Sequence, residues 1–283
     1  MFNAELTSCI ADFCQNLSVP YFGGEQPGET YYYPPLFVYI FGNCDVTGPR
    51  ARIHAYGYHE GEGGKGGNNV ASLLLRFLHY NNWIVEGRCA ERLSIVMDNC
   101  AGQNKNKMVL RLALMLVEFK YFKRVEFIFY VKGHTKNTCD RMFNLLKLRY
   151  HASNVYTMDM LHDTLNVVED VSFEIVTSIV FWNLDEFFNK FYKNFKAGTV
   201  RDNHIFWVDH EQPTVMVSKS FDNDPIEVMF DHNKKINGDR LHIMHSTPRT
   251  HVRMPGNFVF NFLLCSLLLS SSLSFFFYCY LRY

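Results

Sequence analysis

The chain lacks the features that mark several common protein classes. Its eight cysteines are scattered and include no Cys-x-x-Cys pair, so neither a disulfide framework nor a four-cysteine zinc site is expected, and a reducing compartment fits best. Neither sign of charge is in excess, because Lys+Arg and Asp+Glu each number 28. Overall charge therefore predicts neither nucleic-acid nor membrane binding. No basic segment followed by an apolar stretch opens the chain, so no signal peptide is predicted.

Apolar and aromatic residues are plentiful instead. The 283 residues include 26 Phe and 16 Tyr, which is too apolar a composition for a disordered chain. This length is enough for one large domain or two small ones with a substantial core. Any contact with nucleic acid must then come from a local patch on a folded surface.

The last part of the chain is unusually apolar. Residues 258–281 carry no charge and are numerous enough to cross a bilayer of about 30 Å as a helix. Arg249 and Arg253 precede them, which would keep the N-terminal side in the cytoplasm. Two interpretations stay open: a single-pass membrane anchor, or a Ser/Leu/Phe-rich end unrelated to the rest of the chain.

Hydrophobic periodicity predicts a β-β-β-α-β-α-β-α order over the first half of the chain. The expected strands are residues 5–13, 36–42, 51–58, 92–97 and 125–131. The first expected helix has its apolar stripe at residues 70–78, and the other two span residues 107–122 and 137–150. A hairpin meander that leads into βαβ units is typical of an α/β fold with a mixed five-stranded sheet flanked by helices. The first strand begins so close to Met1 that an upstream segment is expected to be missing.

We expect three segments in the chain. Residues 1–150 form the α/β core, residues 151–256 form an α+β extension, and residues 257–283 form the apolar tail. Within the extension, the pattern predicts helices at 158–168 and 172–191 and a small β region at 203–230.

Three aspartates fall where the expected strands and helices would bring them together. Asp12 lies in the first strand, Asp98 directly follows the strand at 92–97, and Asp140 lies near the start of the third helix. Polar groups are costly at the end of a core strand unless they are hydrogen-bonded or bind something. The three acids are therefore predicted to converge on one sheet edge, as in a divalent-metal phosphoryl-transfer site. Backbone donors at Asp12, or a helix dipole and a pair with Lys136 or Arg141 at Asp140, are the alternatives.

Amide, imidazole and hydroxyl groups accompany these acids. Between Asp98 and the following helix, amide side chains are expected to orient the carboxylate, bind phosphate or cap the helix; they are Gln103, Asn104 and Asn106. Asn137 and His134 stand beside Asp140 in the same way. His134 is a candidate metal ligand, proton shuttle or supporting residue for a ligand.

A glycine-rich loop at 59–68 offers a further candidate. It leads into a helix and contains Lys65, which favours phosphate binding, but Gly66 follows the lysine and the loop is not a P-loop. A mobile loop without a ligand is the alternative. Glu60 and Glu62 are spare carboxylates that could replace Asp140 as the third acid.

These motifs, taken together, resemble a known group. Asp12 with Gln15-Asn16, His59-Glu60 with Lys65, Asp98-Asn-Cys-x-Gly-Gln-Asn-x-Asn106 and Gly133-His-Thr-x-Asn-x-x-Asp140 resemble an uncharacterised eukaryotic domain family derived from mobile elements. Its members are similar to DDE/D transposases and integrases, and the resemblance covers about residues 5–150.

The resemblance implies a ribonuclease-H-like core in which acids stand on the first strand, after the fourth strand and near the last helix. It implies two Mg²⁺ or Mn²⁺ ions held by Asp12, Asp98 and Asp140, with His134 assisting. It also implies DNA strand cleavage or joining, and a location in the nucleus. Residues expected to contact DNA are Lys65, Gln103, Asn104, Asn106 and Asn137. An inactive, truncated remnant that keeps the fold, or a membrane-anchored protein, is the alternative, because the region where a DNA-binding module is expected is missing.

Overall fold

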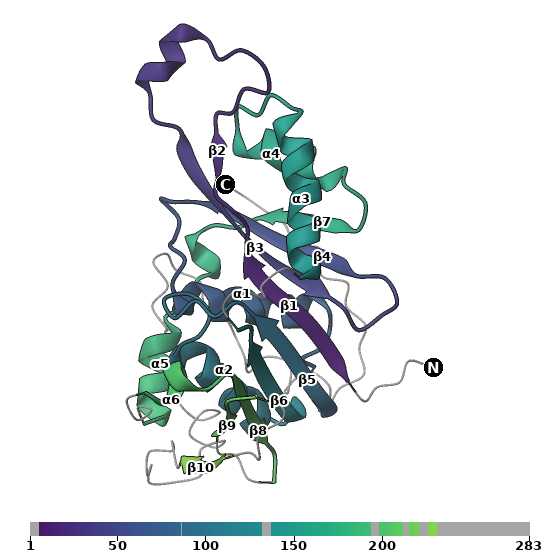
Figure 1. Cartoon of the computed structure of the whole chain (residues 1–283), viewed down its shortest axis with the longest axis vertical. Helices are drawn as coiled ribbons and strands as arrows, with labels where there is room; N and C mark the ends of the chain where they lie inside the picture. The colour runs from purple at the N-terminus through teal and green to yellow at the C-terminus, as the bar shows by residue number, and fades with distance from the viewer. Residues whose placement is uncertain are drawn as a thin grey trace, which may run out of the picture.

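A single mixed sheet organises the chain (Figure 1). The computed structural model describes residues 6–85, 87–131, 137–193, 198–211, 215–220 and 226–230. Its ten strands run in the order β10-β9-β8-β6-β5-β1-β3-β4-β7, and β2 pairs with β3. The strands are β1 Thr7–Phe13, β2 Leu17–Val19, β3 Leu36–Asp45, β4 Arg52–His59, β5 Ala90–Met97, β6 Phe122–Phe129, β7 Val171–Ile175, β8 Ile205–Asp209, β9 Val215–Ser218 and β10 Ile226–Phe230.

Strand β1 lies in the interior of this sheet. It pairs antiparallel with β3 on one side and parallel with β5 on the other. Strand β3 continues antiparallel to β4, and β5 continues parallel to β6. The five strands β4-β3-β1-β5-β6 thus form a meander joined to two parallel strands. Because β1 has a partner on each side, its carboxyl end is held in register with that of its parallel neighbour β5.

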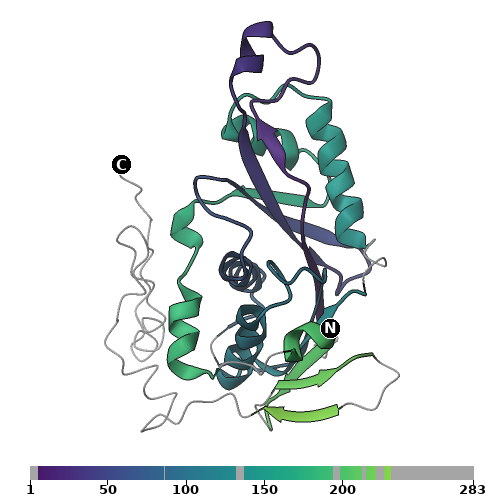
Figure 2. The same cartoon turned by 60° about the vertical axis from the view of Figure 1, so that its left-hand side comes forward.

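Helices cover both faces of the sheet, as Figure 2 shows. Helices α1, α2 and α5 pack on one face around Phe41, Leu74 and Phe127. Helices α3 and α4 pack on the other face around Ile53 and Phe143. The helices are α1 Gly67–Tyr80, α2 Lys107–Glu118, α3 Thr138–His151, α4 Met158–Asn166, α5 Leu184–Phe191 and α6 Thr199–Asp202, with 3-10 turns η1 Gly28–Tyr32 and η2 Ser178–Val180. Two hydrophobic cores therefore fix the sheet between helical layers.

The mixed α/β class predicted from the sequence is confirmed, but the sheet is larger than the expected five strands. Segment 172–191 was expected to be one helix, and this expectation is wrong. Residues Val171–Ile175 form β7, which pairs parallel with β4, and α5 begins only at Leu184. The expected β region at 203–230 extends the same sheet through β8, which pairs with β6.

Helix α2 is shorter than its hydrophobic pattern predicts. The expected helix 107–122 ends at Glu118. Lys120 has a left-handed backbone conformation with φ of 59°, and β6 begins at the fully buried Phe122. The turn at Lys120 stops the helix, because a left-handed residue cannot continue it. The apolar residues after it belong to a strand.

Among the described residues, no helix has the length and apolar character that crossing a membrane requires. The apolar tail at 257–283, for which a membrane anchor was predicted, lies outside the described residues.

Candidate acidic site at the sheet edge

Asp12 and Asp98 leave neighbouring parallel strands at the same level. Ala11 of β1 is the register partner of Met97 of β5, so the next residue on each strand is an aspartate. On its other side, Asp12 is the register partner of Gly42 in β3. A Cβ atom added to Gly42 would lie 2.7 Å from the ring of Phe143 in α3, so this side of the pair faces α3. The predicted convergence of these two acids at one sheet edge therefore agrees with the strand register.

Asp12 sits in an environment that opposes its ionisation. Burial raises the pKa of its carboxyl from the ordinary value to about 7. The backbone N–H of Phe13 donates to Asp12 Oδ1 at 2.7 Å, which lowers the pKa, and the charges of Asp98 and Asp140 raise it. The two neighbouring acids are thus close enough to repel the Asp12 carboxylate.

Asp140 lies at the N-terminus of α3 in a capping box. The Asp140 backbone N–H donates to Asn137 Oδ1 at 3.0 Å, and the Asn137 backbone N–H donates to Asp140 Oδ2 at 3.1 Å. This arrangement satisfies two N–H groups of the first helical turn and places a carboxylate where the helix dipole favours it. The alternative structural role considered for Asp140 is therefore present, although through Asn137 rather than through a basic partner.

The raised pKa of Asp12 predicts a pH-dependent stability difference. Because the folded pKa of about 7 exceeds the unfolded value of about 3.9, folding takes up a proton between these pH values. The wild type therefore loses unfolding free energy as pH rises to about 7, whereas Asp12→Asn does not. We expect Asp12→Asn to match the wild type at pH 4 and to be more stable by about 1–3 kcal/mol at pH 8, a range reduced for solvent screening.

Urea unfolding in EDTA at pH 4, 6 and 8 measures this difference. Asp163→Asn is the matched control, since that carboxylate lies on the exposed surface of α4. A stability gap between Asp12→Asn and wild type that stays constant from pH 4 to pH 8 would contradict the prediction.

Within the described ranges, no three His, Cys, Asp or Glu side chains form a group that could hold a metal ion. The three aspartates thus interact electrostatically without forming a closed set of ligands. Glu60 and Glu62, the alternative third acids, are directed elsewhere. The Phe37 N–H donates to Glu60 Oε1 at 3.3 Å, and the Ser178 N–H donates to Glu62 Oε2 at 2.6 Å.

Lys65 of the glycine-rich loop lies beside the acids. Its ammonium group stands 5.0 Å from the ring centroid of Phe13 and 5.2 Å from that of Tyr39. Burial lowers the pKa of Lys65, and the charges of Cys14 and Asp12 raise it. Two aromatic faces therefore hold a partly desolvated cation whose charge acts on Asp12. The structure brings this predicted residue to the site.

Two of the predicted amides cap helices. Asn106 Oδ1 accepts hydrogen bonds from the N–H groups of Met108 at 2.9 Å and Val109 at 3.3 Å, at the start of α2. Asn137 has the corresponding role in α3. Gly67 lacks a Cβ where one would lie 2.5 Å from Asn106, so the beginnings of α1 and α2 approach closely. Asn106 therefore fixes the end of the loop that follows Asp98, and Asn137 fixes the first turn of α3, which carries Asp140.

Of the other predicted residues, Asn104 is fully buried, and neither polar atom of its side chain has a hydrogen-bond partner within the described structure. A direct contact between Asn104 and a substrate would require the loop at 98–106 to move. Gln103 is partly exposed. His134 lies outside the described residues, so its predicted roles remain predictions.

Residues 54–224, more than half of the chain, match a family described as Domain of unknown function (DUF7869). The chain belongs to this family. The DUF7869 match includes Asp98 and Asp140 and begins after Asp12. No curated protein and no solved structure matches the chain.

Lys105 of this DUF7869 chain is a residue that sequence reasoning missed. It is only 3% exposed, and its ammonium group donates to the Arg201 carbonyl at 2.9 Å. Burial lowers its pKa, and its charge contributes to lowering the pKa of His204. Lys105 thus ties the loop after Asp98 to α6. Its position between Asn104 and Asn106 was the only available signal, and nothing in the sequence showed that it is buried.

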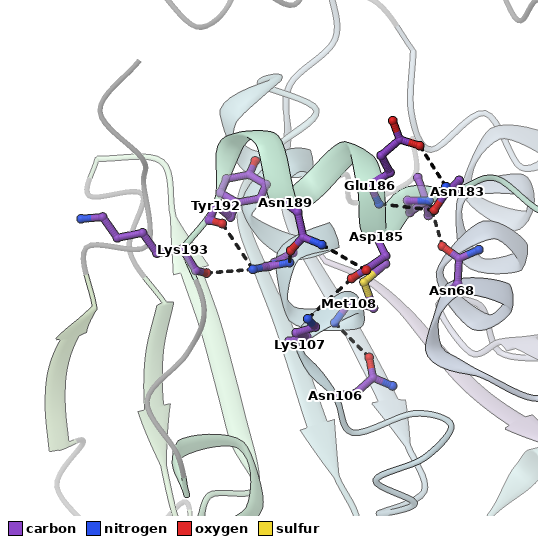
Figure 3. A network of polar contacts seen from close by, with 12 residues as sticks. Asn68, Asn106, Lys107, Met108, Asn183, Asp185, Glu186, Asn189, Tyr192 and Lys193 are labelled. Carbon is purple, nitrogen blue, oxygen red and sulfur yellow. Dashed lines mark hydrogen bonds and ion pairs between the residues drawn. The ribbon is translucent and has the colours of Figure 1, made fainter. Parts of the chain in front are cut away.

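Arg111 is a second missed residue of the DUF7869 domain, and it joins α2 to α5. Its buried guanidinium donates to Asn189 Oδ1 at 2.8 Å and to the carbonyls of Tyr192 at 3.3 Å and Lys193 at 2.9 Å. Figure 3 shows the surrounding network, in which Asn189 also donates to Asp185. The helix that follows the acid-bearing loop is therefore anchored by a buried charge.

Proposed function

We propose that this chain carries a ribonuclease-H-like core that performs metal-dependent phosphoryl transfer on DNA, as strand cleavage or joining of the kind catalysed by transposases. The observation that carries the proposal is the register of β1 and β5, which sets Asp12 and Asp98 side by side. The proposal is also supported by the charges of Asp98 and Asp140, both of which raise the pKa of Asp12.

The strand order supports the finer fold assignment. Strands β4-β3-β1-β5-β6 combine a three-stranded antiparallel meander with two parallel strands, which is the order of ribonuclease-H-like sheets. In that set Asp12 lies on the first strand, Asp98 follows the fourth strand and Asp140 lies on the helix after the fifth. These are the three positions expected of the acids.

The donor set suits Mg²⁺ or Mn²⁺. Asp12 and Asp98 would hold the ions through hard carboxylate oxygens, and Asp140 would complete the site. Its Oδ2 accepts from Asn137, and an ionised carboxylate retains a second oxygen for another partner. When bound, a pair of such ions supplies an activated water or 3′-hydroxyl and stabilises the leaving oxygen.

The residues of the chain have distinct parts in this proposal. The carboxylates of Asp12 and Asp98 repel each other, and a divalent cation would relieve this repulsion, so binding would release the proton that Asp12 retains near neutral pH. Lys65 would neutralise a non-bridging phosphate oxygen at the same edge, since its ammonium donates to the Cys14 carbonyl at 3.5 Å and its charge acts on Asp12.

A non-catalytic protein that retains the fold is the second candidate. The engagement of Asp140 in the capping box favours it, because that carboxylate already stabilises α3 without a ligand. In this alternative the three aspartates bind no metal ion, and the protein binds nucleic acid without cleaving it.

Titration with Mn²⁺ and Mg²⁺ while the melting temperature is followed tests the proposal. We expect a rise of about 5–10 °C at saturating Mn²⁺, because a ligand at 100 times its Kd adds about 2.7 kcal/mol and each kcal/mol shifts Tm by about 2–4 °C. The Asp12→Ala/Asp98→Ala double variant is expected to show no rise.

The matched control is Asp159→Asn/Asp163→Asn, which removes two exposed carboxylates of α4 and should leave the rise intact. An unchanged melting temperature of the wild type in both ions would favour the non-catalytic alternative. An equal rise in the wild type and the double alanine variant would place any metal binding away from this edge.

A further inference from the structure

A small cavity lies between the β1–β2 connection and α3, beyond the acids. Its volume is about 120 Å³, below the several hundred Å³ of a pocket for a whole small molecule. Its walls are formed by Gln15, Asn16, Leu17, Ser18, Tyr21, Lys147, Tyr150 and His151. A cavity of this size admits a few water molecules or one small polar group.

Three polar side chains of this lining make no hydrogen bond within the described residues: the cation Lys147 and the amides Gln15 and Asn16. The Tyr150 hydroxyl is engaged, since it donates to the Ser18 carbonyl at 2.6 Å and accepts from the Ser18 N–H at 3.1 Å. His151 Nδ1 is hydrogen-bonded to the Tyr21 hydroxyl at 2.8 Å. Over the described ranges, Lys147 forms no ion pair with a carboxylate. A partly buried ammonium group without an anionic partner favours an anion.

The cavity and the acidic edge, defined by Asp12 and Asp98 at the strand ends and Asp140 at the start of α3, lie along the same helix. Asp140 stands at the start of α3, and Lys147 follows seven residues later, which corresponds to about 10 Å along the helix axis. Parallel to this, the chain passes from Asp12 in β1 to Gln15 and Asn16 before β2. Figure 1 shows β2 and α3 on the same side beyond the end of β1. At a rise of about 3.4 Å per nucleotide, this separation spans about three nucleotides of one strand.

We propose that this cavity binds a backbone phosphate of the nucleic-acid strand on which the acids act, with Lys147 supplying the charge and Gln15 and Asn16 donating hydrogen bonds. The inference rests on the proposed function for its ligand, but its contacts involve none of the three aspartates. The cavity fixes the register of the strand, because phosphate contacts position a nucleic acid without reading its sequence.

Binding of a fluorescein-labelled single-stranded oligonucleotide to the full chain in EDTA, followed by anisotropy at several salt concentrations, tests this proposal. Lys147→Gln is expected to weaken binding by about 5- to 10-fold and to lower the slope of log K against log salt by about one. Lys147→Arg should restore most of the affinity. Lys190→Gln is the matched control, since its ammonium pairs with Glu186 on α5, and it should bind as the wild type does.

Competition with inorganic phosphate distinguishes a strand phosphate from the free ion. Phosphate that displaces the oligonucleotide from wild type but not from Lys147→Gln supports the proposal. Equal affinities of Lys147→Gln, Lys190→Gln and wild type for the oligonucleotide overturn it. Inorganic phosphate that binds at Lys147 without displacing the oligonucleotide also overturns it. The assay contains EDTA and therefore no divalent metal. If Lys147→Gln also weakens oligonucleotide binding in the Asp12→Asn/Asp98→Asn background, the phosphate site is supported even if the catalytic proposal fails.

Discussion

Asp12→Asn and Asp98→Asn are each expected to reduce Mn²⁺-dependent nicking of supercoiled plasmid DNA by at least about 100- to 1000-fold. Each substitution keeps the volume of the side chain and removes one anionic oxygen from the edge where β1 and β5 end together. Loss of several kcal/mol of stabilisation at a metal site corresponds to a rate loss of this size. Gel analysis of initial nicking rates in Mn²⁺, Mg²⁺ and EDTA measures it.

The controls for this result separate chemistry from folding. Asp163→Asn on α4 should nick DNA at the wild-type rate. Asn137→Ala removes the cap of α3 while leaving Asp140 in place, and its activity should fall less than that of Asp140→Asn. Wild-type nicking rates in both Asp12→Asn and Asp98→Asn would show that the acidic edge takes no part in the reaction.

Arg111→Met is expected to lower the free energy of unfolding by about 2–4 kcal/mol, because it removes the three hydrogen bonds that Nη1 and Nη2 donate to Asn189 and to the Tyr192 and Lys193 carbonyls. Methionine retains much of the volume of the arginine side chain, so a cavity left by the substitution contributes little to the loss of stability. Urea unfolding followed by circular dichroism measures the change.

Arg88→Met is the comparison, since Arg88 lies on the exposed surface and its loss should change stability by less than about 0.5 kcal/mol. Equal unfolding midpoints for Arg111→Met and Arg88→Met would show that the α2–α5 connection contributes little. A reduced stability with normal Mn²⁺-induced stabilisation would show that Arg111 supports the fold and leaves the acidic edge intact.

The positions of Asp12 and Asp98 were predictable because a residue at the end of a buried strand is placed by the strand. Periodicity located β1 and β5, and parallel pairing brought their ends together. The amides were harder to interpret, since an asparagine before a helix looks the same in sequence whether it caps the helix or binds a ligand. The structure gives Asn106 and Asn137 capping roles.

Long-range pairing explains what the sequence pattern missed. Segment 172–191 was expected to be helical, but Val171–Ile175 alternates apolar and polar residues as a strand does, and it pairs in parallel with the edge of β4. The burial of Lys105 depends likewise on α6, about a hundred residues later. The contact between Lys105 and Arg201 leaves no local pattern in the sequence, whereas the alternation at Val171–Ile175 was a signal for β7 that the helical interpretation overlooked.

The position of β7 and β8 has a consequence for how the protein can be divided. Both strands come after α3 in the chain, yet β7 covers the free side of β4 and β8 covers the free side of β6. A fragment ending at residue 150 would retain all three aspartates and expose the N–H and C=O groups of both outer strands. Such edges pair readily with other chains. Solubility of the acidic core therefore depends on a part of the sequence that contributes none of the three aspartates.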